Sequence, residues 1–277
     1  MSRLDSILAV LALGSAAPLA AQGVLIAPHA IYIDHARRSG TVTLYNPNRD
    51  AAEVTISTAF GYPVTDSLGH FALRTVEHPD SMLPSAAEWV QAFPRRLTIA
   101  SLERQTVRLL VTPPAGLPDG EYWARLIISA RGGRLPIGGV EDTAAVRVRL
   151  NLVVNTNIGV AYRKGPVATG VALSNLRVRI RRDSVEVWSR LERRLTAAYV
   201  GTVRATLVDS TGKVRSTLSA PIAVYFVMEP RYALAVAGLA PGLYWLRYEL
   251  VTDREDLDPA VVLQASAVRD SVELRLP

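Results

Sequence analysis

The sequence contains no cysteine, few aromatic side chains, and no long hydrophobic run beyond its N-terminal end. The lack of cysteine excludes disulfides, a thiolate nucleophile, cysteine metal ligands and a lipid-modified N-terminal cysteine. Aromatic residues make up only 6% of the 277 residues, and no set of stacking aromatics accompanies the arginines. Nucleic acid is therefore not expected as a partner. Since no later run reaches the roughly 20 residues of a spanning helix, no membrane span is expected after the N-terminal segment.

What the chain does contain is typical of a folded β protein. Hydrophobic residues make up 49% and charged residues 20%, the composition of a globular chain, and the net charge is +6. Valine, isoleucine and threonine recur throughout, and their branched side chains suit a pleated sheet better than a helix. The positive charge favours acidic partners without naming one.

Residues 1–21 have the pattern of a cleavable secretory signal. The apolar run 7–13 follows Arg3, and small residues lead to a cleavage site before Gln22. A membrane anchor is the alternative, but the run is about half the length that a spanning helix needs. We therefore expect an exported, periplasmic protein. Its net charge stays at +6, because Arg3 and Asp5 are removed together.

Hydrophobic residues alternate with polar ones along the chain, and turn residues break this pattern every 8 to 12 residues or so, as in sandwiches and barrels. The strands expected in the first half are 23–34, 40–45, 52–58, 105–112, 121–129 and 143–154. Pro79 and Pro84 interrupt the one stretch of helical character, 81–91, which is predicted to be an irregular connection.

A second series of strands follows the short basic segment 162–166, whose Gly-Pro pair is typical of a linker. Apolar residues and arginines alternate along 176–181, which predicts a half-buried strand with a cationic face. Residues 209–213 predict a hairpin turn. The expected fold is all-β, with two immunoglobulin-like β-sandwich domains joined by a short linker. The predicted divisions are a signal peptide at 1–21, a first sandwich at 22–156 and a second at 157–277.

One short motif occurs in both halves. Residues 120–125 (GEYWAR) and 242–247 (GLYWLR) share Gly, Tyr, Trp and Arg at the same spacing, each at the start of the penultimate strand of its half. A tyrosine just inside such a strand can hydrogen-bond back to the preceding corner, as in immunoglobulin-like sandwiches. The repeat favours two domains of similar build.

Motifs of catalysis and cofactor binding are absent. The sequence has no Gly-x-Ser-x-Gly elbow, phosphate loop or dinucleotide fingerprint. His29 and His35 would lie about 20 Å apart on a strand, too far for one metal ion. The acidic run Asp253, Glu255, Asp256 and Asp258 lacks the glycine of a calcium loop, so a solvated loop is preferred over a cation site. We expect no enzyme activity, no metal and no cofactor.

Residues 24–154 resemble the N-terminal domain of the PapD-like family of periplasmic pilus-assembly chaperones. Five segments occur in the family's order, and the second half of the chain matches only as a second sandwich of suitable size. The segments are 24–33 (VLIAPHAIYI), 41–47 (TVTLYNP), 93–99 (FPRRLTI), 105–109 (QTVRL) and 117–123 (LPDGEYW).

The resemblance implies that the chain is a chaperone that donates an edge strand to an incomplete, pilin-like subunit. The donor would be the last strand of the first domain, 143–154. The apolar side chains that it would offer are Val146, Val148, Leu150 and Leu152. The same alternation would also suit a strand whose apolar side packs in its own core, and the pattern does not separate the two.

The family holds the subunit's terminal carboxylate with an arginine on the first strand and a lysine on the last strand of this domain. The corresponding positions here are His29 and Asn151, with Arg149 one strand step away. A neutral histidine and an asparagine lack the charge that strengthens such hydrogen bonds. The expected partners are a pilin-like or other β-rich subunit and, as a second candidate, an outer-membrane usher. The alternative function is a structural or adhesive envelope protein built of immunoglobulin-like modules.

Overall fold

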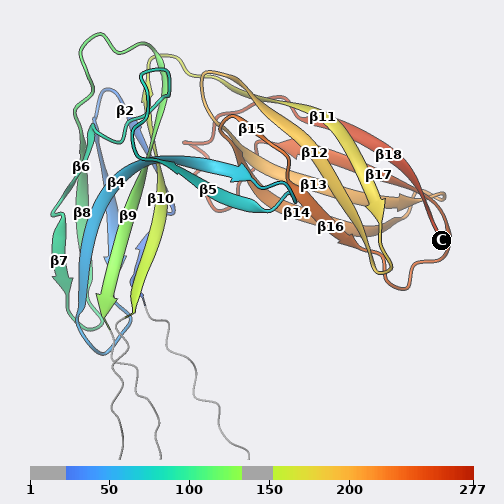
Figure 1. The fold of residues 1–277 in the computed structure, drawn as a ribbon, viewed down its shortest axis with the longest axis horizontal. Helices are drawn as coiled ribbons and strands as arrows, with labels where there is room; N and C mark the ends of the chain where they lie inside the picture. Colours follow the sequence, from blue (N-terminus) through green and yellow to red (C-terminus); the bar gives the residue numbers. More distant parts are fainter. Residues whose placement is uncertain (1–22, 133–151) are drawn as a thin grey trace, which may run out of the picture.

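The computed structural model describes residues 23–132 and 152–277, and the helix and strand elements within them are all β-strands. Figure 1 shows two β-sandwiches that meet at one end and point in different directions. The prediction of an all-β chain with two immunoglobulin-like sandwiches is confirmed. The signal peptide expected over 1–21 lies outside the described residues.

The first sandwich consists of two sheets. One sheet has the order β1-β3-β8-β6 and the other the order β2-β10-β9-β4-β5, with β7 also paired to β4. The strands are β1 (Leu25–Ala27), β2 (Ala30–Asp34), β3 (Ser39–Tyr45), β4 (Ala52–Thr65), β5 (Phe71–Val76), β6 (Val90–Phe93), β7 (Arg96–Ile99), β8 (Arg104–Val111), β9 (Gly120–Gly132) and β10 (Val153–Lys164).

The predicted first strand, 23–34, is divided between the two sheets. Its first part, β1, pairs with β3, whereas its second part, β2, pairs in parallel with β10. Pro28 lies between the two parts and has no backbone N–H to give to a ladder, so the strand is interrupted there. As predicted, residues 81–91 contain no helix.

The last strand of the first sandwich runs further than the sequence indicated. β10 pairs with β9 from Val153 to Lys164, so the predicted domain boundary at residue 156 falls inside a strand. Residues 162–164 of the predicted linker belong to this strand as well. We propose that the boundary lies at the turn that begins with Gly165, where φ is +63°.

The second sandwich also has two sheets. They have the orders β11-β12-β15, with β16 also paired to β12, and β14-β13-β17-β18. The strands are β11 (Thr169–Ile180), β12 (Ser184–Leu195), β13 (Tyr199–Asp209), β14 (Val214–Val224), β15 (Val227–Met228), β16 (Arg231–Ala235), β17 (Gly242–Val251) and β18 (Val268–Leu276).

The predicted hairpin turn joins β13 to β14. Asp209 N donates to Lys213 O at 3.0 Å, and Gly212 has a φ of +83°. Hydrogen bonds from the Thr211 hydroxyl, and also from Arg215, hold the pKa of the Asp209 carboxyl well below its usual range. This prediction from the sequence is confirmed.

The tyrosine of the repeated motif makes the same corner bond in both domains. The Tyr122 hydroxyl donates to Pro118 O at 2.9 Å, and the Tyr244 hydroxyl donates to Ala240 O at 2.8 Å. Both residues lie at the start of the penultimate strand, as predicted. The two halves therefore have the same local architecture at this point.

Candidate functional site

One edge of β10 has no partner strand over half its length. On one side, β9 pairs with β10 from Val153 onward, but on the other side β2 pairs only from Gly159. Among residues 23–132 and 152–277, no strand pairs with that second edge between Val153 and Ile158. Within the described residues, the backbone N–H and C=O groups of this edge therefore have no ladder partner.

The inward-facing side chains of β10 change from buried to exposed along this free edge. Ile158 and Thr156 lie opposite the buried Leu126 and Ile128 of β9, so they face the core. Ile158 is 1% exposed, Thr156 and Val154 are half-buried, and Leu152 is 47% exposed. The row of side chains therefore continues past the end of the sandwich's own core.

This row includes one of the four predicted donor residues, Leu152. The other three, Val146, Val148 and Leu150, lie outside the described residues, as do the anchor candidates Arg149 and Asn151. The third anchor candidate, His29, is described and exposed, and it follows β1 at the crossing between the two sheets.

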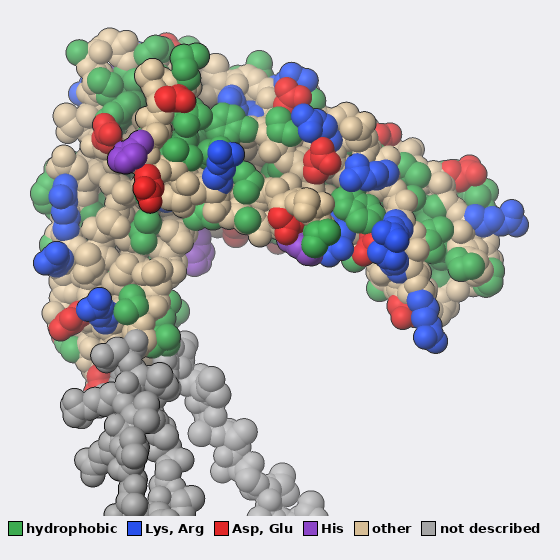
Figure 2. Space-filling model, viewed as in Figure 1, with side chains coloured by type: hydrophobic (Ala, Val, Ile, Leu, Met, Phe, Trp, Pro, Cys, Tyr) green, Lys and Arg blue, Asp and Glu red, His purple; other side chains and the backbone are tan. Residues whose placement is uncertain are grey.

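A cavity of about 420 Å³ lies between the domains, beside Gly159, where the free edge of β10 ends. His29 and Tyr32 line it from the first strand, Arg125 from β9, and Tyr225 and Arg254 from the second domain. Figure 2 shows that the molecule is bent, with the two domains on either side of the bend. The cavity therefore joins the free strand edge to the second domain.

Arg125 is the cation at the centre of this cleft. Its register partner on β10 is Gly159, where an added Cβ would lie only 3.2 Å from Arg125 Nη1, so the guanidinium fills the space of the missing side chain. Arg125 Nε donates to Gly61 O at 3.0 Å, and the guanidinium lies 5.4 Å from the centroid of the Tyr225 ring. No acidic side chain of the described residues pairs with Arg125.

Sequence reasoning missed Arg125. Its position in the repeated motif was recognised, but its role depends on the register between β9 and β10 and on Gly159. Neither can be read from one strand alone.

Tyr32 closes the cleft on the side of the first strand. Burial raises the pKa of its hydroxyl to about 12, and the nearby side chains of Tyr225 and Glu121 act in the same direction. The guanidinium of Arg163 lies 4.5 Å from the centroid of the Tyr32 ring, and its Nη1 donates to Val261 O at 2.7 Å. The loop of the second domain around Val261 is thereby held against the first domain.

Glu121 joins the two domains through hydrogen bonds. Its carboxylate, only 4% exposed as a residue, accepts hydrogen bonds from Trp123 Nε1 at 2.8 Å and Arg163 Nε at 2.7 Å in the first domain. It also accepts one from Ala198 N of the second domain at 3.0 Å. Three donors therefore converge on this buried carboxylate and replace the hydrogen bonds that it would make with water.

A hairpin of the first domain forms a second connection. The distal part of β4 and the whole of β5 leave the first sandwich and reach the second domain near β16 (Figure 1). Glu229 N donates to Thr65 Oγ1 at 2.8 Å, and Arg231 N donates to Gly69 O at 3.0 Å. Arg231 Nη2 also donates to His70 Nε2 at 2.7 Å, so the hairpin tip is bonded through backbone and side chains.

Replacing Gly69 by alanine is expected to displace this hairpin tip. Gly69 has a φ of +80°, and a Cβ there would lie 2.6 Å from Arg231 Cβ and 2.8 Å from Arg231 N. The backbone conformation alone costs about 1–2 kcal/mol for a residue other than glycine, and the collision adds to it. We expect the Arg231 amide to lose its protection in hydrogen exchange.

Gly212→Ala is the matched control for this variant. Gly212 has nearly the same φ, +83°, but nothing lies within 4 Å of its added Cβ. It should lose stability through the backbone alone and leave the Arg231 amide protected. Equal protection of that amide in both variants would show that the hairpin tip does not depend on close approach.

The acidic loop of the second domain is engaged with arginines. Arg254 pairs with Asp256 at 2.6 Å, and Asp253 pairs with Arg204. Within 23–132 and 152–277, no group of three or more metal-ligating side chains comes together. In the same residues, no helix is long and apolar enough to cross a membrane.

No protein-family model and no curated protein matches this chain. Solved structures do resemble it along nearly its whole length. The YadV chaperone is 14% identical, with a TM-score of 0.44, over 91% of this chain and 99% of that chain.

Other solved structures that resemble this chain contain a bound subunit. The SafB chaperone of Salmonella enterica, in complex with the SafA pilin, is 13% identical, with a TM-score of 0.44, over 90% of this chain and 96% of that chain. The CsuC chaperone of Acinetobacter baumannii, in complex with the CsuE tip adhesion subunit, is 15% identical, with a TM-score of 0.45, over 90% of this chain and 97% of that chain.

Proposed function

We propose that this protein is a periplasmic chaperone that binds an exported, pilin-like or other β-rich subunit by lending it the free edge of β10. The observation that carries this proposal is the unpaired edge from Val153 to Ile158, with a row of side chains that leaves the core at Leu152. The chaperone needs no cofactor for this task, because the interaction is strand addition.

Strand addition combines two kinds of contact. The open backbone groups of Val153 to Ile158 form a ladder with the client strand, and alternate side chains enter a groove of the client. Leu152 is the first of these side chains beyond the core, and Val146, Val148 and Leu150 continue the same alternation in the sequence. A client whose sandwich lacks one strand would bury these side chains in place of those of the missing strand.

The cleft provides an anchor for the end of the client chain. The free edge ends at Gly159, and Arg125 lies directly beside that residue without an acidic partner among the described residues. In this proposal Arg125 holds a terminal carboxylate through charge-assisted hydrogen bonds, with His29 on the same cavity wall. It takes the place of the basic pair that the resemblance assigns to the first and last strands.

Delivery of the client to an outer-membrane usher would follow from this role. The signal-like segment 1–21 would direct the protein to the periplasm, where the usher and the exported subunit are both accessible. Release would require another strand to replace the donated one in the client's groove, because each strand edge can pair with only one strand at a time.

The test is purification of the protein with its client from the native envelope. Leu152→Asp places a charge on the apolar row, while Val153→Asp, the matched control, places it on the opposite face of the same strand. Both side chains are already more than a third exposed, so neither change should unfold the sandwich. We expect wild type and Val153→Asp to retain a small β-rich subunit and Leu152→Asp to retain about tenfold less.

Circular dichroism would check that both variants fold. Equal recovery of the subunit with Leu152→Asp and Val153→Asp would contradict strand donation by this row. Recovery of no β-rich subunit with the wild type would instead support the structural or adhesive alternative.

A further inference from the structure

The repeated motif presents a tryptophan and an arginine on the outer face of each domain. In β9, Trp123 and Arg125 alternate with the core residues Ala124 and Leu126. In β17, Trp245 and Arg247 alternate with the core residues Leu246 and Tyr248 in the same way. The two pairs therefore occupy equivalent positions on equivalent strands.

In the first domain this pair is covered by aromatic side chains of the second domain. Tyr225 lies against both members, 4.7 Å from Trp123 by ring centroids and 5.4 Å from the Arg125 guanidinium. Phe226 packs on the other part of Trp123, at 5.5 Å. A Trp-x-Arg pair on the outer face of this sheet is thus a place where an aromatic side chain from another domain binds.

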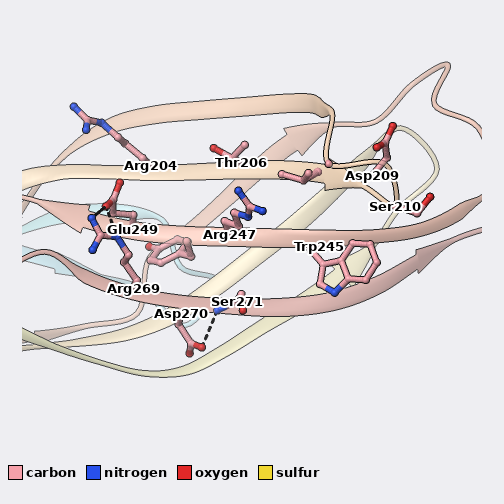
Figure 3. A pocket seen from close by; sticks show the side chains of 13 residues that line it. Arg204, Thr206, Asp209, Ser210, Trp245, Arg247, Glu249, Arg269, Asp270 and Ser271 are labelled. Carbon is pink, nitrogen blue, oxygen red and sulfur yellow. Dashed lines mark hydrogen bonds and ion pairs between the residues drawn. The ribbon is translucent and has the colours of Figure 1, made fainter.

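In the second domain, no aromatic side chain of residues 23–132 or 152–277 covers the equivalent pair. Trp245 is half-buried and Arg247 exposed, and both line a groove of about 900 Å³ over the outer face of the sheet. Figure 3 shows the two side chains on one strand, with Thr206 and Ser271 on the strands at either side. The small hydroxyl side chains beside Arg247 correspond to Ala59 and Gly159 beside Arg125.

Of the three arginines that line this groove, Arg247 is the one without an ion pair among the described residues. Arg269 pairs with Glu249 at 2.6 Å, and Arg204 pairs with Asp253. Arg247 forms no ion pair within the described parts of the chain, and its register neighbours are the hydroxyl groups of Thr206 and Ser271. Three donor side chains therefore adjoin one another next to Trp245, and a carboxylate would satisfy them.

We propose that this groove binds an extended peptide segment of a partner protein that has an aromatic side chain at one position and a carboxylate two residues further on. Residues two apart on an extended chain lie about 6.6 Å apart on the same face, which is the spacing of Trp245 and Arg247 on β17. The aromatic ring packs on Trp245 and the carboxylate binds Arg247, Thr206 and Ser271. Tryptophan and arginine are the side chains that most often dominate protein interfaces.

The site is separate from the strand edge and the cleft of the first domain, so it does not depend on the chaperone role. A partner held here would bind while the free edge of β10 is occupied. The two surfaces belong to different sandwiches.

The test is titration of the full mature protein with a defined peptide, acetyl-Gly-Ser-Phe-Thr-Glu-Ser-Gly-amide, followed by calorimetry and by the NMR signal of the Trp245 indole N–H. We expect saturable binding that shifts this signal. Changing the peptide's phenylalanine to alanine or its glutamate to glutamine should weaken binding about tenfold each, as should Arg247→Ala in the protein.

Arg179→Ala is the matched control, because Arg179 is an exposed arginine on β11 of the other sheet and its loss removes the same charge. It should leave the affinity unchanged. If Arg179→Ala and Arg247→Ala weaken peptide binding equally, the net charge of the protein explains the loss of affinity, and the proposal is overturned. Loss of binding with Arg125→Ala but not with Arg247→Ala would also overturn it, as would a groove that binds a neutral oligosaccharide and not the peptide.

Discussion

Replacing Glu121 by alanine should lower the free energy of unfolding by about 3–5 kcal/mol, the cost of breaking a buried ion pair from one side. The substitution leaves Arg163 without its carboxylate in an environment where the arginine side chain is only 16% exposed. It also leaves the Trp123 indole N–H and the Ala198 amide without their acceptor. Because Ala198 belongs to the second domain, the loss should also loosen the contact between the domains.

Denaturant unfolding followed by tryptophan fluorescence would measure this effect. We expect wild type to unfold with its domains coupled and Glu121→Ala to unfold at a lower denaturant concentration, with separated transitions. Glu53→Ala removes an exposed carboxylate from β4, and its free energy of unfolding should stay within about 0.5 kcal/mol of the wild-type value. If Glu121→Ala and Glu53→Ala unfold alike, Glu121 does not join the domains.

Replacing Trp123 by alanine should lower the free energy of unfolding by a similar amount, about 3–5 kcal/mol, because the substitution leaves a cavity between the two domains. Trp123 is 1% exposed, and Tyr225 and Phe226 pack on its ring. Arg193 also lies over it, with its guanidinium 5.4 Å from the ring centroid. Burial lowers the pKa of Arg193, in keeping with a guanidinium partly removed from water.

Trp245→Ala is the internal control for this experiment. It makes the same change at the equivalent position of the repeated motif, where no aromatic side chain in the described part of the chain covers the ring. This substitution should lower the free energy of unfolding by about 1 kcal/mol, because little buried surface is lost. Thermal or denaturant unfolding of the two variants would compare them directly. Equal losses would mean that Trp123 contributes no more than an ordinary surface tryptophan.

Much of the fold could be predicted because it depends on local patterns. Alternating Val, Ile and Leu predicted strands at β3, β8 and β9, and the glycine of residues 209–213 predicted the hairpin turn. Gly, Tyr and Trp at one spacing predicted the corner bonds of Tyr122 and Tyr244. Each of these features involves residues within one strand or one turn.

Features that need several strands were missed or misplaced. The division of the first strand at Pro28 and the extension of β10 to Lys164 both depend on which partner strand is available. The hairpin that reaches from β4 and β5 to Arg231 was not predicted, because its end is recognised only by the domain that it contacts. Arg125 was missed for the same reason.

The sequence by itself determined that this protein is made of two similar β-sandwiches, and that an apolar alternation runs up to Leu152. Side-chain periodicity of two and turn residues are local, so they can be read along the chain. Only the tertiary structure decided that β2 leaves part of β10 uncovered and that Gly159 admits Arg125. It also decided that aromatic side chains of the second domain lie against one Trp-x-Arg pair while the other pair faces outward. These outcomes depend on register and on which surfaces meet, and both are set by contacts between residues far apart in the sequence.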